Sequence, residues 1–186
     1  MEDDDPAEQL WVKISNQRIN IRIGLVYAPQ ESRTKKAELK IMYDKIKDQI
    51  EIGKNNKEKT LVMGDFNCKI GTEVKGNALT VTKGGKLLKD LTEKTNMEIL
   101  NCTELCTGTW TRQENGQKSV LDYVLVNKEE IKSIEQMHID EEKEKAPYTQ
   151  AEGRKVYSDH ITIILEANIC TKTFANICKI SAPGEG

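Results

Sequence analysis

The chain has 186 residues, which is enough for one domain with a substantial hydrophobic core. Hydrophobic residues make up 37% of the sequence and charged residues 31%, and no apolar run approaches the roughly 18 residues that a membrane-spanning helix needs. The formal net charge of −2 gives no sign of a general attraction to nucleic acid, although a local basic groove would be enough for binding. The composition therefore argues against a membrane partner and leaves nucleic-acid binding open.

The cysteines and histidines narrow the possible metal and redox sites. There are five cysteines, an odd number without a CxxC pair, which argues against a disulfide framework or a zinc site and predicts reduced thiols. Histidine occurs only at His138 and His160, so we expect any metal ion to lie among carboxylates. Residues 2–5 are all acidic, unlike the basic start of a signal peptide, and we expect an intracellular protein.

The first part of the chain predicts two strands and a helix. Residues 10–14 are a short strand candidate, and residues 19–27 alternate with the period of two that is typical of a strand. Pro29 ends this second strand because it cannot donate to a β-ladder. Residues 35–52 carry one apolar stripe at helical spacing, with Gly53 as the expected C-cap.

An apolar run at residues 60–63 predicts a buried strand that leaves the sheet at Gly64. Asp65 and Asn67 follow directly, so a carboxylate and an amide project from the end of this strand. Strand ends are frequent places for chemistry because a rigid scaffold holds the loops there. We therefore expect other polar groups of the chain to gather at Asp65.

The remaining sequence predicts further short elements. The expected elements are a helix at 86–95, strands at 97–100, 107–111, 119–126 and 161–165, a loop at 68–85, an exposed charged segment at 129–144 and a mobile loop at 143–155. Asn115-Gly116 is a hairpin turn signal. We expect a disordered lead-in at 1–9, one domain at 10–168 and a tail at 169–186 without a clear place in the core.

Three aspartates lie in or beside apolar strands, namely Asp65, Asp122 and Asp159. A buried carboxylate is costly unless it is paired or binds a metal ion. Any one of the three could be a satisfied structural residue, but three of them together with the neighbouring His160 favour a functional site.

Each of these groups has a plausible chemical role. Asp159 is a hard oxygen ligand that suits Mg²⁺, and Asp122 could orient a neutral His160 or balance its charge. Asp65 could orient or deprotonate a water molecule, since nearby acids would raise its pKa. Asp159 and His160 would point to opposite faces of a regular strand, so both can face one substrate only at a strand end or a kink.

Two further side chains could contact a phosphate. Asn67 can donate to a phosphate oxygen or help to place Asp65, and its alternative is an ordinary turn residue. Tyr27 can offer its phenol to the same phosphate, and its alternative is core packing.

Four ordered motifs resemble those of the endonuclease/exonuclease/phosphatase superfamily: Val26-Tyr27-Ala28-Pro29, Gly64-Asp65-Phe66-Asn67, Leu121-Asp122-Tyr123-Val124-Leu125 and Ser158-Asp159-His160. The resemblance runs from about residue 11 to residue 165. Within the superfamily, the chain looks most like endonuclease domains of non-LTR retroelements and host proteins derived from them, with the craniofacial development protein 2-like (bucentaur-type) group closest. Thr109-Trp110-Thr111, followed by a polar turn and the Asp-Tyr strand, adds to this likeness.

The resemblance implies an α/β fold, a four-layer α/β/β/α sandwich of the DNase I-like type, and metal-dependent phosphodiester hydrolysis on DNA with Mg²⁺ or Mn²⁺. The implied catalytic residues are Tyr27, Asp65, Asn67, Asp122 and His160, and the implied metal ligand is Asp159. Asp65 would act on the attacking water, while Asn67 and Tyr27 contact the phosphate. His160, held by Asp122, would stabilise the developing charge. The resemblance also favours a nuclear protein and implies no nucleotide cofactor.

The N-terminal half of the family normally brings an Asn on the first strand and a metal-binding Glu on a later one. Only about ten residues precede the first matched strand here, and Glu31 belongs to a different motif. We therefore expect an N-terminally truncated copy with an incomplete first sheet, uncovered apolar strand faces and an incomplete metal site.

Three functions follow as alternatives. The first is a DNA endonuclease. The second is an inactive remnant that acts as a protein- or nucleic-acid-interaction module, with a protein partner covering the open sheet. The third is a phosphatase acting on a lipid or a small phosphate.

Overall fold

The computed structural model describes residues 8–31, 36–76, 79–146, 148–151, 154–168 and 178–180. The expected lead-in therefore lies outside the described residues up to residue 7, while residues 8 and 9 belong to the first strand. The expected tail also lies outside them, except for a strand at residues 178–180. In the described part of the chain, no helix is both long enough and apolar enough to cross a membrane.

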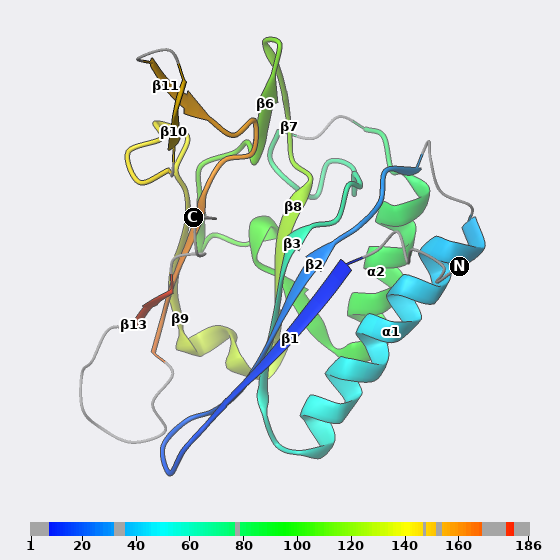
Figure 1. Cartoon of the computed structure of the whole chain (residues 1–186). Helices are drawn as coiled ribbons and strands as arrows, with labels where there is room; N and C mark the ends of the chain where they lie inside the picture. The colour runs from blue at the N-terminus through cyan, green and yellow to red at the C-terminus, as the bar shows by residue number, and fades with distance from the viewer. Residues whose placement is uncertain are drawn as a thin grey trace, which may run out of the picture.

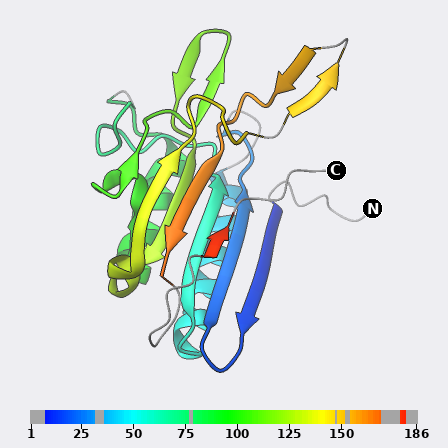
Figure 2. The ribbon, with the colours of Figure 1, turned by 90° about the vertical axis from the view of Figure 1, so that its left-hand side faces the viewer.

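Two sheets pack face to face, and two helices cover the outer face of the first sheet (Figures 1 and 2). The first sheet has the order β1 (Glu8–Ser15), β2 (Asn20–Tyr27), β3 (Lys59–Asp65), β8 (Asp122–Asn127) and β4 (Met97–Ile99). The second has the order β13 (Cys178–Ile180), β12 (Ile163–Ala167), β9 (Ile134–Ile139) and β5 (Cys106–Thr107). The helices are α1 (Lys36–Asn55) and α2 (Lys83–Thr95). The expected α/β class is confirmed, and among the described residues no α-helix covers the second sheet.

Shorter elements connect these layers. Two hairpins stand apart from the main sheets, β6 (Arg112–Glu114) with β7 (Gln117–Ser119) and β10 (Tyr148–Ala151) with β11 (Arg154–Tyr157). Two 3₁₀ turns, η2 (Leu100–Cys102) and η3 (Lys128–Ser133), follow β4 and β8.

The central strand β8 is buried on both faces, as its sequence predicts. Tyr123 and Leu125 join the core between the first sheet and the helices, whereas Val124 and Val126 join the core between the two sheets. A strand with alternating residues in two cores has no solvent-facing side, which explains its nearly continuous apolar sequence. Its polar residues are the two at its ends, Asp122 and Asn127.

Among the described residues, nothing fully covers one apolar face of the first sheet at β1, where Leu10, Val12 and Ile14 are 58%, 42% and 43% exposed. Trp11, on the opposite face, packs toward the helices, so the exposed residues lie on the side of the second sheet. Their register partners on β2 are Leu25, Ile23 and Ile21. The expectation of an uncovered apolar strand face is confirmed at this edge.

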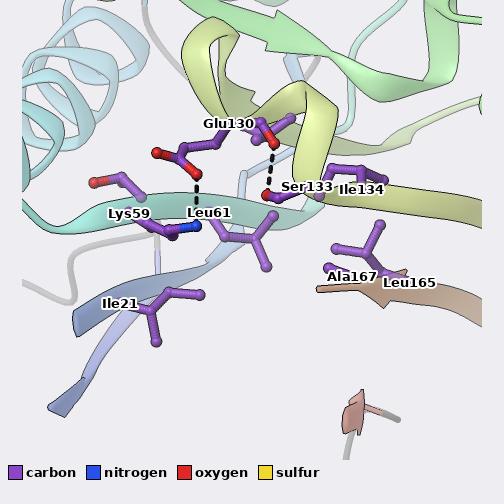
Figure 3. Close-up of a pocket in the computed structure, with 10 residues that line it drawn as sticks. Ile21, Lys59, Leu61, Glu130, Ser133, Ile134, Leu165 and Ala167 are labelled. Carbon is purple, nitrogen blue, oxygen red and sulfur yellow. Dashed lines mark hydrogen bonds and ion pairs between the residues drawn. The ribbon is translucent and has the colours of Figure 1, made fainter. Parts of the chain in front are cut away.

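A cavity lies between the sheets at the end where β3 begins (Figure 3). Leu61 and Ile21 of the first sheet face Ile134 and Leu165 of the second across it. An ion pair between Lys59 and Glu130, 2.8 Å long, closes one side. The two sheets are therefore incompletely packed at this end of the sandwich.

The helix boundaries differ from the sequence expectation. Helix α1 continues through Gly53 to Asn55, so Gly53 is not a C-cap. A Cβ atom at Gly53 would lie 2.3 Å from the Thr60 hydroxyl, so the glycine allows the helix to pack closely on β3. Helix α2 begins at Lys83, earlier than expected, since Thr82 caps it by accepting a hydrogen bond from the Gly85 N–H.

Several predictions of strands and loops were also wrong. The expected strand at 119–126 is broken at residues 120–121 into β7 and β8, and only residue 107 of the expected strand at 107–111 lies in a strand. The segment 129–144 is not simply exposed, because it contains β9 with buried Met137 and Ile139. The expected mobile loop at 143–155 contains most of the β10–β11 hairpin.

Candidate active site

Strand β3 carries Asp65 to the centre of the sheet edge. The sequence predicted that the strand leaves the sheet at Gly64, and this was wrong. The strand continues to Asp65, which pairs with Tyr27 on one side and Asp122 on the other. Gly64 has a φ of 142°, and a Cβ atom there would lie 2.0 Å from the Val26 carbonyl oxygen. The glycine is therefore required by the close approach of β2 and β3.

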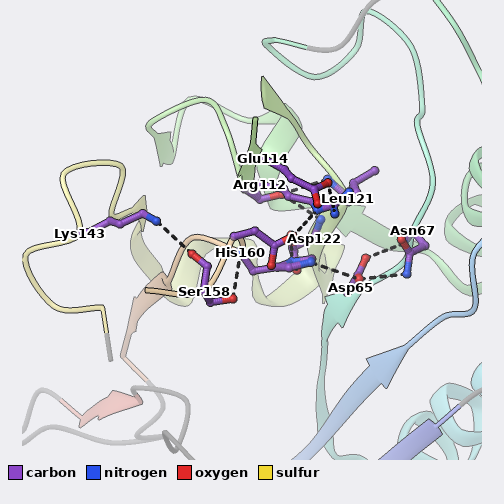
Figure 4. A network of polar contacts seen from close by, with 11 residues as sticks. Asp65, Asn67, Arg112, Glu114, Leu121, Asp122, Lys143, Ser158 and His160 are labelled. Carbon is purple, nitrogen blue, oxygen red and sulfur yellow. Dashed lines mark hydrogen bonds and ion pairs between the residues drawn. The ribbon is translucent and has the colours of Figure 1, made fainter. Parts of the chain in front are cut away.

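The imidazole of His160 lies between two carboxylates (Figure 4). Its Nδ1 atom is 3.0 Å from Oδ1 and 3.1 Å from Oδ2 of Asp122, and its Nε2 atom is 3.7 Å from Oδ2 of Asp65. The hydrogen bond to Asp122 raises the pKa of His160, against the opposing effect of burial. The structure thus brings together three of the residues that the sequence singled out.

The carboxyl group of Asp65 has an unusual pKa. Burial, and secondly the charge of Asp122, raise it to about 6, although the N–H of Asn67 and the neighbouring His160 act in the opposite direction. A carboxyl group that titrates near neutrality can accept and return a proton under ordinary conditions. This is the property that general-base chemistry requires.

Asn67 holds Asp65 in place. Its backbone N–H donates to Asp65 Oδ1 at 2.7 Å, and its side-chain amide donates to Asp65 Oδ2 at 3.0 Å and to the Ala28 carbonyl at 2.7 Å. The residue has a φ of 45°, a left-handed conformation that Asn tolerates well. Its placing role and its turn role are therefore both visible in the structure.

Tyr27 lies beside Asp65 on the neighbouring strand, and 52% of its surface is exposed. Core packing, the alternative considered from the sequence, is therefore not what the structure shows. The exposed ring is at the same sheet edge as the carboxylate, where a substrate could reach both.

Asp159 has a different partner from the one the sequence suggested. Its Oδ2 atom accepts a hydrogen bond from Arg112 Nε at 2.7 Å, and this bond lowers the pKa of Asp159. Arg112 also donates through Nη2 to Glu114 at 2.7 Å. Glu31, which the sequence assigns to a different motif from the metal-binding Glu of the family, accepts a hydrogen bond from the Gly84 N–H at the start of α2. The metal-ligand role of Asp159 stays a prediction.

The short segment 111–113 connects the start of β8 with residues 159–161. The sequence did not predict this role. The Thr111 hydroxyl accepts from the N–H groups of Leu121 and Asp122 at 2.9 and 3.0 Å. The Thr111 carbonyl accepts from Ile161 at 2.7 Å, and the Gln113 N–H donates to the Asp159 carbonyl at 2.8 Å.

These bonds explain how neighbouring residues serve one site. Strand β12 begins only at Ile163, so Asp159 and His160 precede the regular strand and need not point to opposite faces. The His160 N–H donates to the Ser158 hydroxyl at 3.1 Å, which bends the chain locally. The polar residues Thr111 and Arg112 were the available signal, but their register against residues 159–161 is a long-range feature.

The family profile described as "Endonuclease-reverse transcriptase" matches residues 21–164. No curated protein matches the chain in sequence. Among solved structures, the endonuclease domain of TRAS1, a telomere-specific non-LTR retrotransposon, is 17% identical with a TM-score of 0.57, and the match covers 87% of this chain and 62% of that domain. The chain thus spans about three fifths of that domain.

Two other structures show the same fold. A 3′ phosphatase from Neisseria bound to a product DNA hairpin is 11% identical with a TM-score of 0.61, and the match covers 87% of this chain and 79% of that one. The catalytic domain of APE2 from Xenopus laevis is 14% identical with a TM-score of 0.55, covering 96% of this chain and 57% of that one. At these identities the likeness concerns the fold alone.

Proposed function

Since the chain belongs to the endonuclease-reverse transcriptase family of the endonuclease/exonuclease/phosphatase superfamily, we propose that it hydrolyses phosphodiester bonds in DNA. The observation that carries the proposal is the row Asp65, His160 and Asp122, in which an imidazole lies between two carboxylates at the end of a central strand. The same edge presents Tyr27 and Asn67.

Each residue has a role that its environment supports. Asp65, with a pKa of about 6, orients the attacking water and accepts its proton. His160, whose pKa is raised by its bond to Asp122 so that the protonated form is favoured, stabilises negative charge that develops on the phosphate. Tyr27 is placed to contact the phosphate, and Asn67 fixes the direction in which Asp65 faces.

A magnesium or manganese ion is part of the proposal through the family resemblance. The described residues contain no group of three or more His, Cys, Asp or Glu side chains arranged to hold a metal ion, and the Asp159 carboxylate is bonded to Arg112. These residues do not by themselves fit a metal site, and each step proposed above is carried out by side chains of the chain. Arg112 holds only the Oδ2 atom of Asp159, so Oδ1 is the atom that would bind a metal ion if Asp159 is a ligand.

DNA is the proposed substrate because the family description and two of the similar folds, a retrotransposon endonuclease and a phosphatase bound to a DNA hairpin, concern nucleic acid. A nuclear location and membership of the craniofacial development protein 2-like group are compatible with this substrate and are proposed with it.

The test is nicking of supercoiled plasmid DNA by the purified chain with Mg²⁺ or Mn²⁺. We expect EDTA to stop the reaction and Asp65→Asn to abolish it. Asp44→Asn, an exposed aspartate on α1, is the matched control and should retain activity. Release of phosphate from a phosphomonoester without nicking would favour the phosphatase function instead, and no EDTA-sensitive cleavage of either substrate would exclude catalysis by this chain.

The uncovered face of β1 favours a second candidate function, a module that binds a protein partner through this face. Three large, exposed apolar side chains on one face of an edge strand are typical of an interaction surface. Size-exclusion chromatography combined with thermal unfolding tests this function. Elution at the monomer mass with one sharp unfolding transition would count against it.

A further inference from the structure

The β10–β11 hairpin carries a pair of tyrosine rings next to the candidate site. Tyr148 and Tyr157 are direct cross-strand partners, and their ring centroids are 5.8 Å apart with an interplanar angle of 55°. Tyr148 is 46% exposed. Tyr157 directly precedes Ser158, Asp159 and His160, so the hairpin leads into the site without an intervening loop.

Two lysine side chains accompany the rings. Lys155 Nζ lies 4.2 Å from the centroid of the Tyr148 ring, and Lys143 Nζ lies 5.4 Å from that of Tyr157. Lys143 also donates to the Ser158 carbonyl at 3.0 Å, which ties this cluster to the segment that bears His160. The exposed Tyr148 ring and the adjacent ammonium groups suit a ligand that has both flat rings and negative charge.

The position of the hairpin restricts the kind of ligand. The β6–β7 hairpin rises at the same end of the molecule (Figures 1 and 2). Lys118 Nζ of β7 lies 5.9 Å from the centroid of the Trp110 ring. Paired bases inside a duplex are stacked on each other and do not offer their faces to a side chain, whereas an unpaired base does. The exposed ring of Tyr148 is therefore suited to an unpaired base.

We propose that Tyr148 and Lys155 bind an unpaired nucleotide beside the phosphate to be cleaved, so that the preferred substrate is nucleic acid with a single-stranded segment at that point. The base takes the place that Lys155 Nζ holds over the Tyr148 ring, 4.2 Å from its centroid, and Lys155 moves aside to pair with the neighbouring phosphate. This inference rests on the proposed function, because it assumes that the site acts on a nucleic-acid phosphate.

The test is binding of fluorescent oligonucleotides to the full chain in EDTA, measured by anisotropy for a single strand and for a blunt duplex. Tyr148→Ala should weaken single-strand binding about tenfold and leave duplex binding nearly unchanged, while Tyr148→Phe keeps the ring and retains binding. Lys155→Ala should lower the slope of log affinity against log salt by about one, and Tyr148→Ala should leave that slope unchanged.

Ile41→Ala, at an exposed apolar side chain of α1, is the control and should alter none of these values. Equal affinities of Tyr148→Ala and the unaltered chain for the single strand would overturn the inference, and so would equal losses for single strand and duplex or an absence of binding to both. Asp65→Asn separates the two proposals, because it should abolish nicking without changing single-strand affinity. Tyrosine-dependent binding by a chain that never nicks would retain this inference and reject the proposed function.

Discussion

Two borders of the first sheet, the one where β3 ends at Asp65 and the one formed by the edge strand β1, are built in opposite ways. At the Asp65 end, each carboxylate of the site has a partner on another strand or loop, and the bonds run between β3, β8, the 111–113 segment and the residues before β12. At the β1 edge, Leu10, Val12 and Ile14 have register partners within the sheet but remain 42% to 58% exposed. Within the described residues, the charged groups of the site are therefore paired with one another, whereas the apolar side chains of β1 stay largely open to solvent.

The largest expected effect is on catalysis. Asp65→Asn removes the group that accepts the proton, and we expect plasmid nicking to fall by about 10³-fold. The melting temperature should change little, because the loss of one of the two bonds that Asp65 accepts from Asn67 is offset by removal of a charge that burial and Asp122 disfavour. A variant that keeps more than a tenth of the activity would show that Asp65 is only a structural part of this well-connected end.

The next largest effect is on stability. Gly64→Ala places a Cβ atom against the Val26 carbonyl, 2.0 Å away, and should cost about 3 kcal/mol of unfolding free energy. Gly116→Ala is the matched control, because its φ is also positive, at 78°, but nothing lies within 4 Å of the added atom. It should cost about 1 kcal/mol. Equal losses in urea unfolding would mean that backbone conformation, and not the approach of β2, decides the effect.

A pH profile sharpens the electrostatic side of the comparison. Asp65 must be ionised to act as a base, so activity should be lost as the pH falls through about 6. His160 must be protonated, so activity should also be lost as the pH rises through its elevated pKa. The rate should therefore show a bell-shaped dependence on pH.

The same profile measured on Asp122→Asn tests the assignment. Removing this charge lowers the pKa of Asp65 and also that of His160, so both limbs should move to lower pH while the maximal rate falls about 10²-fold. Limbs that move in opposite directions, or only one limb that moves, would contradict the shared position of Asp122.

The smallest effect is expected at the β1 edge. Val12→Ser replaces an exposed side chain and should change the unfolding free energy by less than about 0.5 kcal/mol, whereas Leu61→Ala in the core between the sheets should cost about 3 kcal/mol. Urea unfolding of both variants measures the difference. A loss above about 2 kcal/mol for Val12→Ser would show that this face is covered in solution.

The sequence predicted those features that depend on local patterns. Alternation located β2, helical spacing located α1, and Asn115-Gly116 located the turn between β6 and β7. The convergence of Asp65, Asp122 and His160 was also predictable, because three polar groups beside apolar strands need a shared explanation.

The features that the sequence could not predict depend on long-range register. The bond between Arg112 and Asp159 joins residues 47 positions apart, and no local pattern indicates it. The break between β7 and β8 follows from the role of Thr111, whose hydroxyl accepts from Leu121 and Asp122. Segment 129–144 misled because its many charges conceal the alternation of β9, which buries Met137 and Ile139.

The cavity between Leu61 and Leu165 shows where the interior of the sandwich can be altered without contact with the site. Hydrogen bonds through the 111–113 segment tie the two sheets together at the Asp65 end, while the end where β3 begins is incompletely filled. The unfilled space is therefore separated from His160 and Asp122 by the length of β3, and a substitution that fills or enlarges it changes packing away from the hydrogen bond between them.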